Sequence, residues 1–406
     1  MEVDSRFHSV AYAVCIYGGL MEEEEGKEGT THLLEHLLLR GTKRRSALQI
    51  AELMDELGSN VNAFTDAASL CLYAVVRAQD LPRLMELFSE LLLEDGIGDA
   101  DLELEKEVVK REIEESQDDP GEIVYRCFAE HFWRGTPMAK PLLGDVGSLD
   151  RISVSDLKGR LSSLLRASNV RIVAVGKVDE ELLLSHAERT YALLPPGGGF
   201  SAPTCNPDYG LYYAPSPAAQ VYLSLAKRWP SYCDEDFLPS LLINALLGGG
   251  MSSRLFRALR EERALSYSVD SQVELFWGHS VMTIGSILDR DKLGEALRCL
   301  SEVMGSLTEG GLLPGEFERA KAMLIAQAEL ERDDLSDRLW DIVESDFQLG
   351  RATEHSDYVA ALAELSVWDA ERAIERWIRG KPYLLVLGGN VGIGEGQIDP
   401  QILPRV

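Results

Sequence analysis

Cysteine and histidine are both scarce in this chain of 406 residues, which contains six cysteines and seven histidines. No C-x-x-C pair occurs, and the cysteines are widely spaced at Cys15, Cys71, Cys127, Cys205, Cys233 and Cys299. This spacing argues against a cysteine-based zinc site and against a disulfide framework. Free cysteines are typical of a reducing compartment, so we expect a cytoplasmic protein.

Long hydrophobic runs are also missing. No stretch of about 18 apolar residues occurs, so the sequence predicts no transmembrane helix and no membrane partner. The first residues, MEVDSRFHSVAYAV, lack the basic start, the apolar stretch and the small-residue cleavage site of a signal peptide. These absences again favour the cytoplasm.

Positive charge is in short supply, with 40 lysines and arginines against 67 aspartates and glutamates and a net charge of −27. Such a chain repels polyanions, so nucleic acid is not expected as a partner. The densest acidic run, MEEEEGKEG at residues 21–29, is typical of a solvated loop. The alternative is that some of the acidic charge attracts basic peptides.

The order of patterns along the chain indicates two similar halves. Pro and Gly cluster within residues 195–210, which predicts a linker between a domain at 1–194 and a domain at 211–406. Each half shows about eight alternating residues, followed by segments with apolar residues at helical spacing. In the first strand the alternating set is Val10, Tyr12, Val14 and Ile16. We therefore predict an internal duplication of an α+β domain, each copy an antiparallel β-sheet with helices packed on one face.

A helix is predicted directly after the first strand. Thr30 or Thr31 is a suitable N-cap, leucines fill the interior, and Gly41 is a suitable C-terminal cap. The helix contains THLLEH, residues 31–36, and with it two of the seven histidines. The central question of the sequence is whether these histidines bind a metal.

The spacing within THLLEH suits a zinc site. Residues four apart share one face of a helix, so His32 and His36 can point at the same metal ion. Glu35 is then close enough to reach water at that metal. The pattern is HxxEH, the inverted form of the zinc-protease motif HExxH. A helix with incidental histidines is the alternative, and the short pattern alone does not exclude it.

A later predicted helix, LEKEVVKREIEES, supplies several glutamates. Glu105 and Glu112 are two turns apart, so they share a face beside Val108 and Val109. A carboxylate beside an apolar face needs a partner or a metal. The other glutamates of this helix are better explained as solvated charges. This helix could therefore provide the third protein ligand that a zinc site with two histidines needs.

Together these motifs resemble the M16 family of zinc metallopeptidases, the inverzincins. The chain is most similar to the short, two-domain M16B type, as in mitochondrial processing peptidase and bacterial two-domain peptidases. In that family HxxEH is followed by a glutamate on a later helix, and Glu112 lies 76 residues after His36 (112 − 36). The resemblance implies that His32, His36 and Glu112 bind one Zn²⁺ per chain and that Glu35 is the general base. It also implies that Glu105 supports the site without binding the metal.

Another stretch, GSNVNAFT at residues 58–65, resembles the edge strand to which an extended substrate adds in that family. The resemblance implies that the substrate-binding residues are Asn62, Ala63, Phe64 and Thr65. Without the resemblance, an ordinary strand after a glycine turn is the simpler interpretation.

The segment LGGGMSSRLFRALREERALSYSV resembles the most recognisable motif of the second M16 domain. A glycine run before a helix also occurs in phosphate loops, but GK[ST] is missing here. The arginines of this segment would be solvated by default. The resemblance instead implies that Arg260 and Tyr267 bind the substrate backbone and help to stabilise the tetrahedral oxyanion.

The second half contains no HxxEH. When its long helix is aligned with that of the first half, Glu105 matches Glu318, but Glu112 matches Ile325. The first domain is therefore expected to bind the metal and the second to bind the substrate. The chain also starts about one strand later than is usual in the family. The first sheet is expected either to lose an edge strand or to receive one from another chain.

The expected activity is that of a zinc metalloendopeptidase that cleaves extended peptides or small unfolded polypeptides in a clam-like chamber between the two domains. Two-domain members need two chains to close such a chamber. Because this chain contains both the zinc motif and the Arg/Tyr pair, a homodimer is sufficient, and a heterodimer with another M16 chain stays open. The alternatives are a non-catalytic partner subunit of a peptidase complex and a maturase dedicated to one leader peptide.

Overall fold

The computed structural model describes residues 1–58, 61–198 and 202–391. Residues 199–201 of the predicted linker and residues 392–406 of the predicted second domain lie outside this range. Within the described residues, every helix is too short or too polar to cross a membrane.

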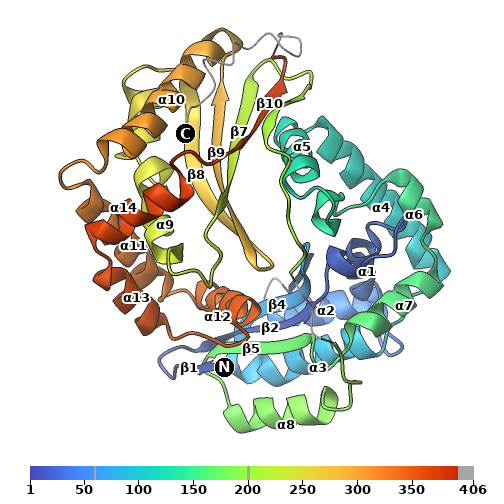
Figure 1. Cartoon of the computed structure of the whole chain (residues 1–406). Coiled ribbons are helices and arrows are strands. Elements are labelled where there is room, and N and C mark those ends of the chain that lie inside the picture. Colours follow the sequence, from blue (N-terminus) through green and yellow to red (C-terminus); the bar gives the residue numbers. More distant parts are fainter. Residues whose placement is uncertain (59–60, 199–201, 392–406) are drawn as a thin grey trace. The chain divides into compact units, whose positions relative to one another are not determined.

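The chain forms two compact units, and each is described here by itself (Figure 1). The first unit consists of Met1–Glu115, Lys140–Ser201 and Glu331–Ala352, and the second consists of Ser116–Ala139, Ala202–Leu330 and Thr353–Val406. Neither unit is one continuous stretch, because each includes a helical segment from the other half of the sequence. The predicted domain limits at 194 and 211 stay predictions. In the structure, Ser116–Ala139 of the predicted first domain belongs to the second unit, and Glu331–Ala352 of the predicted second domain belongs to the first unit.

A five-stranded sheet with the order β1-β5-β2-β4-β3 is the centre of the first unit. Its strands are β1 (Glu2–Val3), β2 (Ser9–Tyr17), β3 (Asn62–Thr65), β4 (Ser69–Arg77) and β5 (Val170–Gly176). Strand β2 lies in the middle and pairs antiparallel with β4 and β5. Strand β1 is an edge and pairs with β5 in parallel, and β3 forms the other edge.

One face of this sheet carries the main hydrophobic core of the unit. Alternate side chains of a strand point to the same face, and Val10, Tyr12, Val14 and Ile16 of β2 are all fully buried there. The helices of this unit are α1 (Thr30–Leu38), α2 (Ala47–Leu57), α3 (Leu81–Leu93), most of α4 (Asp99–Asp118), α6 (Val146–Arg151), α7 (Val154–Leu164), α8 (Glu180–Thr190) and α12 (Leu335–Leu349). All of these except α12 contribute side chains to this core.

Helix α12 covers the opposite face of the same sheet, although it comes from a distant part of the chain (Figure 1). Its leucines pack on Ala11 and Ala13, whose small side chains leave room for a helix close to the strand. Near the end of α12, Asp346 accepts a hydrogen bond from the hydroxyl group of Tyr17 at 2.9 Å. The sheet is therefore buried on both faces.

The second unit repeats this arrangement. Its sheet has the order β6-β10-β7-β9-β8, which is the same sequence of first, last, second, fourth and third strand. The strands are β6 (Gly210–Ala214), β7 (Val221–Trp229), β8 (Ser266–Phe276), β9 (His279–Leu288) and β10 (Leu384–Gly389). The helices are α5 (Pro120–Phe132), α9 (Phe237–Gly248), α10 (Leu293–Gly310), nearly all of α11 (Glu316–Glu331), α13 (His355–Glu364) and α14 (Val367–Trp377).

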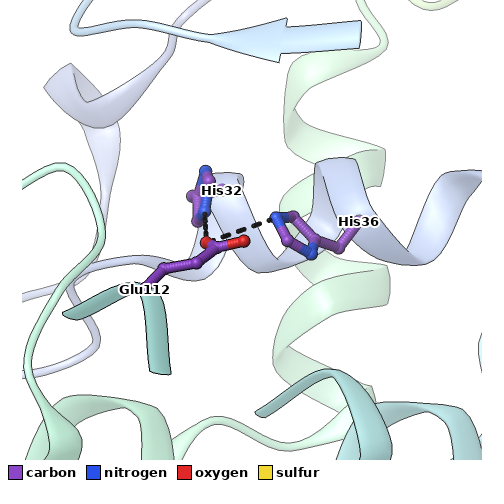
Figure 2. Close-up of side chains that lie close together, drawn as sticks. All are labelled: His32, His36 and Glu112. Atoms are coloured by element: carbon purple, nitrogen blue, oxygen red, sulfur yellow. Dashed lines mark hydrogen bonds and ion pairs between the residues drawn. The ribbon is translucent and has the colours of Figure 1, made fainter. Parts of the chain in front are cut away.

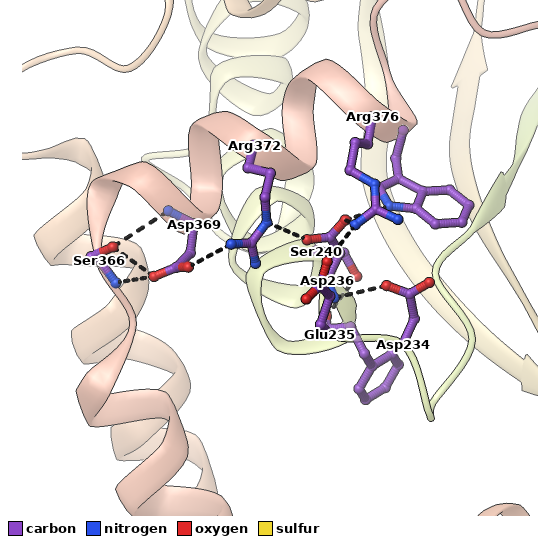
Figure 3. A network of polar contacts seen from close by, with 10 residues as sticks. Asp234, Glu235, Asp236, Ser240, Ser366, Asp369, Arg372 and Arg376 are labelled. Atoms are coloured by element: carbon purple, nitrogen blue, oxygen red, sulfur yellow. Dashed lines mark hydrogen bonds and ion pairs between the residues drawn. The ribbon is translucent and has the colours of Figure 1, made fainter.

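Helix α5 of the second unit takes the place that α12 takes in the first, because it packs on β6, β7 and β10. The close approach depends on Gly388 of β10, where an added Cβ atom would lie 2.2 Å from Cγ2 of Val124. On the other side, α14 is attached to the start of α9 through the buried carboxylate of Asp236 (Figure 3). This carboxylate accepts a hydrogen bond from Arg372 at 2.8 Å and forms an ion pair with Arg376 at 2.8 Å.

The predicted α+β class and the internal duplication are confirmed by these two sheets. Three details differ from the prediction. The sheets are mixed, because the first and last strands of each unit run in parallel. Helices cover both faces, since α12 and α5 occupy the second face of each sheet. The first sheet also has its edge strand within this chain, although β1 has only two residues where β6 has five.

Candidate metal centre

Helix α1 holds the two histidines of the THLLEH motif. Its leucines, among them Leu33 and Leu37, are buried in the core, which fixes the helix against the sheet and turns the other side outward. The helix begins at Thr30 after an N-cap at Gly29, so neither threonine is the N-cap that the sequence predicted. It ends at Leu38, three residues before the predicted glycine cap.

Helix α4 brings the glutamates to the same place. It buries Leu102, Val109 and Ile113 in the core, and this apolar face sets the rotation of the helix. Glu105 and Glu112 both lie on the side of α4 that faces the histidines, as their contacts show.

Three predicted ligands meet between these helices (Figure 2). One ligand atom from each of His32, His36 and Glu112 lies within 4.8 Å of the other two. Oε2 of Glu112 lies 3.1 Å from Nε2 of His32 and 3.7 Å from Nε2 of His36. Among the described residues this is the one group of three or more such side chains that could hold a metal ion.

Glu105 contacts the far side of the His36 ring. Its Oε2 lies 3.0 Å from Nδ1 of His36, and its Oε1 accepts hydrogen bonds from the guanidinium group of Arg40. With a proton on Nδ1, His36 donates to Glu105 and presents the lone pair of Nε2 toward Glu112. Histidines that bind zinc commonly donate their other ring N–H to a carboxylate in this way.

Glu35 lies beside the three ligands, and one of its oxygens is unused. Its side chain is only 14% exposed. Oε2 is 3.8 Å from Nδ1 of His32, which is beyond hydrogen-bond range, and it has no hydrogen-bond partner among the described residues. A buried carboxylate oxygen without a partner is costly, so its position next to the histidines indicates a ligand or a water that it can contact.

The charge of His32 is set by its surroundings. Burial lowers the pKa of His32 from its ordinary value, and His36 lowers it further, while Glu112 and Glu35 oppose the shift. The lowered pKa keeps the imidazole ring neutral at neutral pH. A metal binds neutral imidazole, so this environment favours metal binding.

The residues present fit a zinc ion. Two imidazole nitrogens and one carboxylate oxygen form the donor set of many catalytic zinc sites, which leave one further position open. Two further features suit such a site. Oε2 of Glu35 is free to accept a proton from water, and Glu105 orients the ring of His36 through its Nδ1. His32, His36 and Glu112 would hold the ion, and their role as ligands stays a prediction.

The predicted substrate strand is an edge strand. β3 pairs only with β4 among the described residues and lies next to α1. Asn62 is exposed, Phe64 is half-buried, and Ala63 and Thr65 are buried. Among the described residues, no strand pairs with the outer side of β3, so this side is open to a further strand.

Arg260 and Tyr267 belong to the second unit. Arg260 lies in the π-helical segment η4 (Phe256–Glu261), where its guanidinium group is 5.0 Å from the centre of the Phe256 ring. Tyr267 is the second residue of β8 and is 77% exposed. An exposed tyrosine of this kind is available to a ligand, and the roles of both residues stay predictions.

One residue of the site was missed in the sequence. Arg40 binds the carboxylate of Glu105, yet the sequence analysis assigned it no role. The available signal was its spacing, since Arg40 comes four residues after His36. That signal is weak, because α1 ends before Arg40 and only the packing of α4 shows which carboxylate it meets.

Comparison with known proteins shows the family of this chain. The family model of Insulinase (Peptidase family M16) matches residues 1–146, and that of the Peptidase M16 inactive domain matches residues 151–324. The chain is 28% identical to an uncharacterized zinc protease of Streptomyces coelicolor over 94% of this chain and 85% of that protein. It is 24% identical to the uncharacterized zinc protease YmxG of Bacillus subtilis over 95% of this chain and 94% of that protein.

Solved structures share the fold. An M16 inactive-domain protein of Pseudomonas fluorescens superposes with a TM-score of 0.88 at 20% identity, over 95% of this chain and 94% of that chain. A protease of Helicobacter pylori superposes with a TM-score of 0.84 at 19% identity, over 94% of both chains. With both of its halves matched by models of one family, this chain belongs to the M16 family of zinc peptidases.

Proposed function

We propose that this chain is a zinc-dependent endopeptidase of the two-domain M16B type, an inverzincin, that cleaves extended peptides or small unfolded polypeptides. The observation that carries the proposal is the convergence of His32, His36 and Glu112 beside the partnerless oxygen of Glu35. One zinc ion per chain would be held by these three residues. When bound, zinc supplies Lewis acidity, which makes water more acidic and polarises a carbonyl group.

Glu35 is the general base in this proposal. Its Oε2 accepts a proton from the attacking water and then gives the proton to the leaving amine. The short distance from α1 to the edge of β3 supports a role for both in one reaction. An extended substrate would add to β3 by main-chain hydrogen bonds, which recognise a backbone of almost any sequence.

The remaining parts of the proposal rest on the family resemblance. Arg260 and Tyr267 would bind the substrate backbone and the oxyanion, and the substrate would be enclosed in a chamber between the domains. A homodimer, with a heterodimer as the alternative, belongs to the same set of predictions. The cytoplasmic location also stays a prediction that rests on the spacing of the cysteines.

The change from Glu35 to Gln tests the proposal. Glutamine cannot accept the proton, so peptide cleavage should fall by a factor on the order of 10²–10⁴, which is the usual contribution of a general base. Zinc content should stay at the wild-type value, because Glu35 is not one of the three ligands. The control is Glu114→Gln, which changes an exposed glutamate of α4 and should alter neither quantity.

The two readouts are metal content by atomic emission and cleavage of a mixed library of peptides. Wild-type cleavage by the E35Q variant would refute the role of Glu35. If zinc-loaded wild-type protein cleaves no member of the library, a non-catalytic partner subunit becomes the better hypothesis.

A further inference from the structure

The start of α1 cannot cap itself. The first N–H groups of a helix have no partner within the helix, and a side chain at the N-cap position usually accepts one of them. Here that position is Gly29, with φ 90°. A Cβ atom on Gly29 would lie 2.4 Å from the carbonyl oxygen of Leu143. The usual capping residues serine, aspartate and asparagine therefore do not fit at position 29. The N–H groups at the start of α1 need an acceptor from another part of the chain.

Glu23 provides this cap. Its Oε2 accepts a hydrogen bond from the N–H of Gly29 at 2.8 Å, and its Oε1 accepts one from the N–H of Thr31 at 2.6 Å. The negative charge also lies at the positive end of the helix dipole. The prediction that the acidic run is simply a solvated loop is therefore wrong for Glu23, which is half-buried between the exposed Glu22 and Glu24.

A buried arginine holds the same turn from the other side. Arg160 of α7 donates from Nε to the hydroxyl oxygen of Thr31 at 3.1 Å. It also donates to the carbonyl oxygens of Gly18 and Gly19. Its guanidinium group is buried, and the nearby charge of Glu23 counteracts the resulting fall in its pKa. Thr31 is thus fixed through its N–H by Glu23 and through its hydroxyl group by Arg160.

We propose that Glu23 is a positioning residue of the metal centre, which acts through Thr31 on His32; this inference rests on the proposed function. His32 directly follows Thr31, in the first turn of a helix of nine residues. A helix of that length is marginal alone, so an uncapped first turn can fray. Zinc–ligand distances vary by only about 0.2 Å, so a small movement of His32 weakens the site.

The test compares Glu23→Ala with Glu25→Ala, a matched control in the same run of glutamates whose side chain is exposed. The zinc dissociation constant is measured by competition with a chromophoric chelator, and kcat and KM are measured on a fluorogenic peptide. E23A should bind zinc roughly 10-fold more weakly or worse, by analogy with partners that orient zinc ligands directly. Its kcat should fall while KM stays unchanged, because the substrate strand β3 is not altered. E25A should match the wild type.

A third variant, Glu23→Gln, separates a specific cap from a general loss of stability. Glutamine retains one carbonyl oxygen and can accept one of the two N–H bonds, so its zinc affinity should lie between those of E23A and the wild type. It also decides the question if E23A does not fold.

Equal zinc affinity and equal kcat in E23A, E23Q and E25A would overturn the inference, as would a change in KM alone. A wild-type protein that neither binds zinc nor cleaves peptides would instead refute the proposed function, and that result is independent of the variants.

Discussion

The carboxylate of Glu105 offers a quantitative test of how the metal centre is supported. Its side chain is 4% exposed and uses both oxygens, one toward Nδ1 of His36 and one toward Arg40. In the change Glu105→Gln, the amide has almost the same shape but only one acceptor oxygen. One of the two donors then faces the amide NH₂ group, and water cannot replace the lost acceptor because the site is buried.

The expected effect follows from the bond that is lost. A hydrogen bond to a charged group contributes about 1.5–3 kcal/mol, so we take about 2 kcal/mol for the loss of one. Since about 1.4 kcal/mol corresponds to a factor of ten, zinc binding should weaken by about 30-fold. This value lies within the range of roughly 10–100-fold that is typical of partners that orient a zinc-binding histidine.

The assay is a chelator competition on E105Q, the wild type and E114Q, an exposed neutral-amide control on the same helix. A double variant that combines E105Q with Arg40→Met adds a second check, because removal of Arg40 frees the amide oxygen of the introduced glutamine for His36. The double variant should therefore recover part of the zinc affinity. A zinc dissociation constant for E105Q within threefold of the E114Q value would refute the reasoning, because His36 would then be oriented without Glu105.

Two further predictions concern parts of the molecule outside the metal centre. Burial lowers the pKa of Lys227 from 10.5 to about 7, so between these values the unfolded chain binds a proton that the native chain does not, and stability rises with pH. Lys227→Met removes this dependence, so the melting temperature of the variant relative to the wild type should be higher by roughly 5 °C or more at pH 6 than at pH 9. The control Lys177→Met, which changes an exposed lysine of the first unit, should show no such difference. Light scattering of the eluted wild-type chain should give twice its mass of 44.9 kDa, and a fully active monomer would contradict the predicted homodimer.

Much of the metal centre was visible in the sequence because the relevant signals are local. Helix geometry places residues four apart on one face, which was enough to pair His32 with His36. The same periodicity put Glu105 and Glu112 on one side of a later helix, and the structure places both beside the histidines. The alternation within β2 likewise predicted the buried face of the first sheet.

The partners that complete the site depend on contacts between distant segments. Nothing in the spacing of Glu105 shows that it faces Nδ1 of His36 and Arg40, because that contact depends on how α4 packs against α1. In the sequence, Glu23 cannot be distinguished from its neighbours in the acidic run. Its role depends on the contact of its carboxylate with the N–H groups at the start of α1.

By itself, the sequence predicted the duplication from the order of its patterns, and helical spacing paired His32 with His36 and Glu105 with Glu112. The choice of Glu112 as the third zinc ligand came from the resemblance to the M16 family. Only the tertiary structure decided that α12 and α5 cover the second face of each sheet and that the first and last strands run in parallel. It also decided which carboxylate caps α1, which one orients His36 and which one has an unused oxygen. The physical reason is that a glutamate has the same local pattern in all three roles, and only its packed surroundings distinguish them.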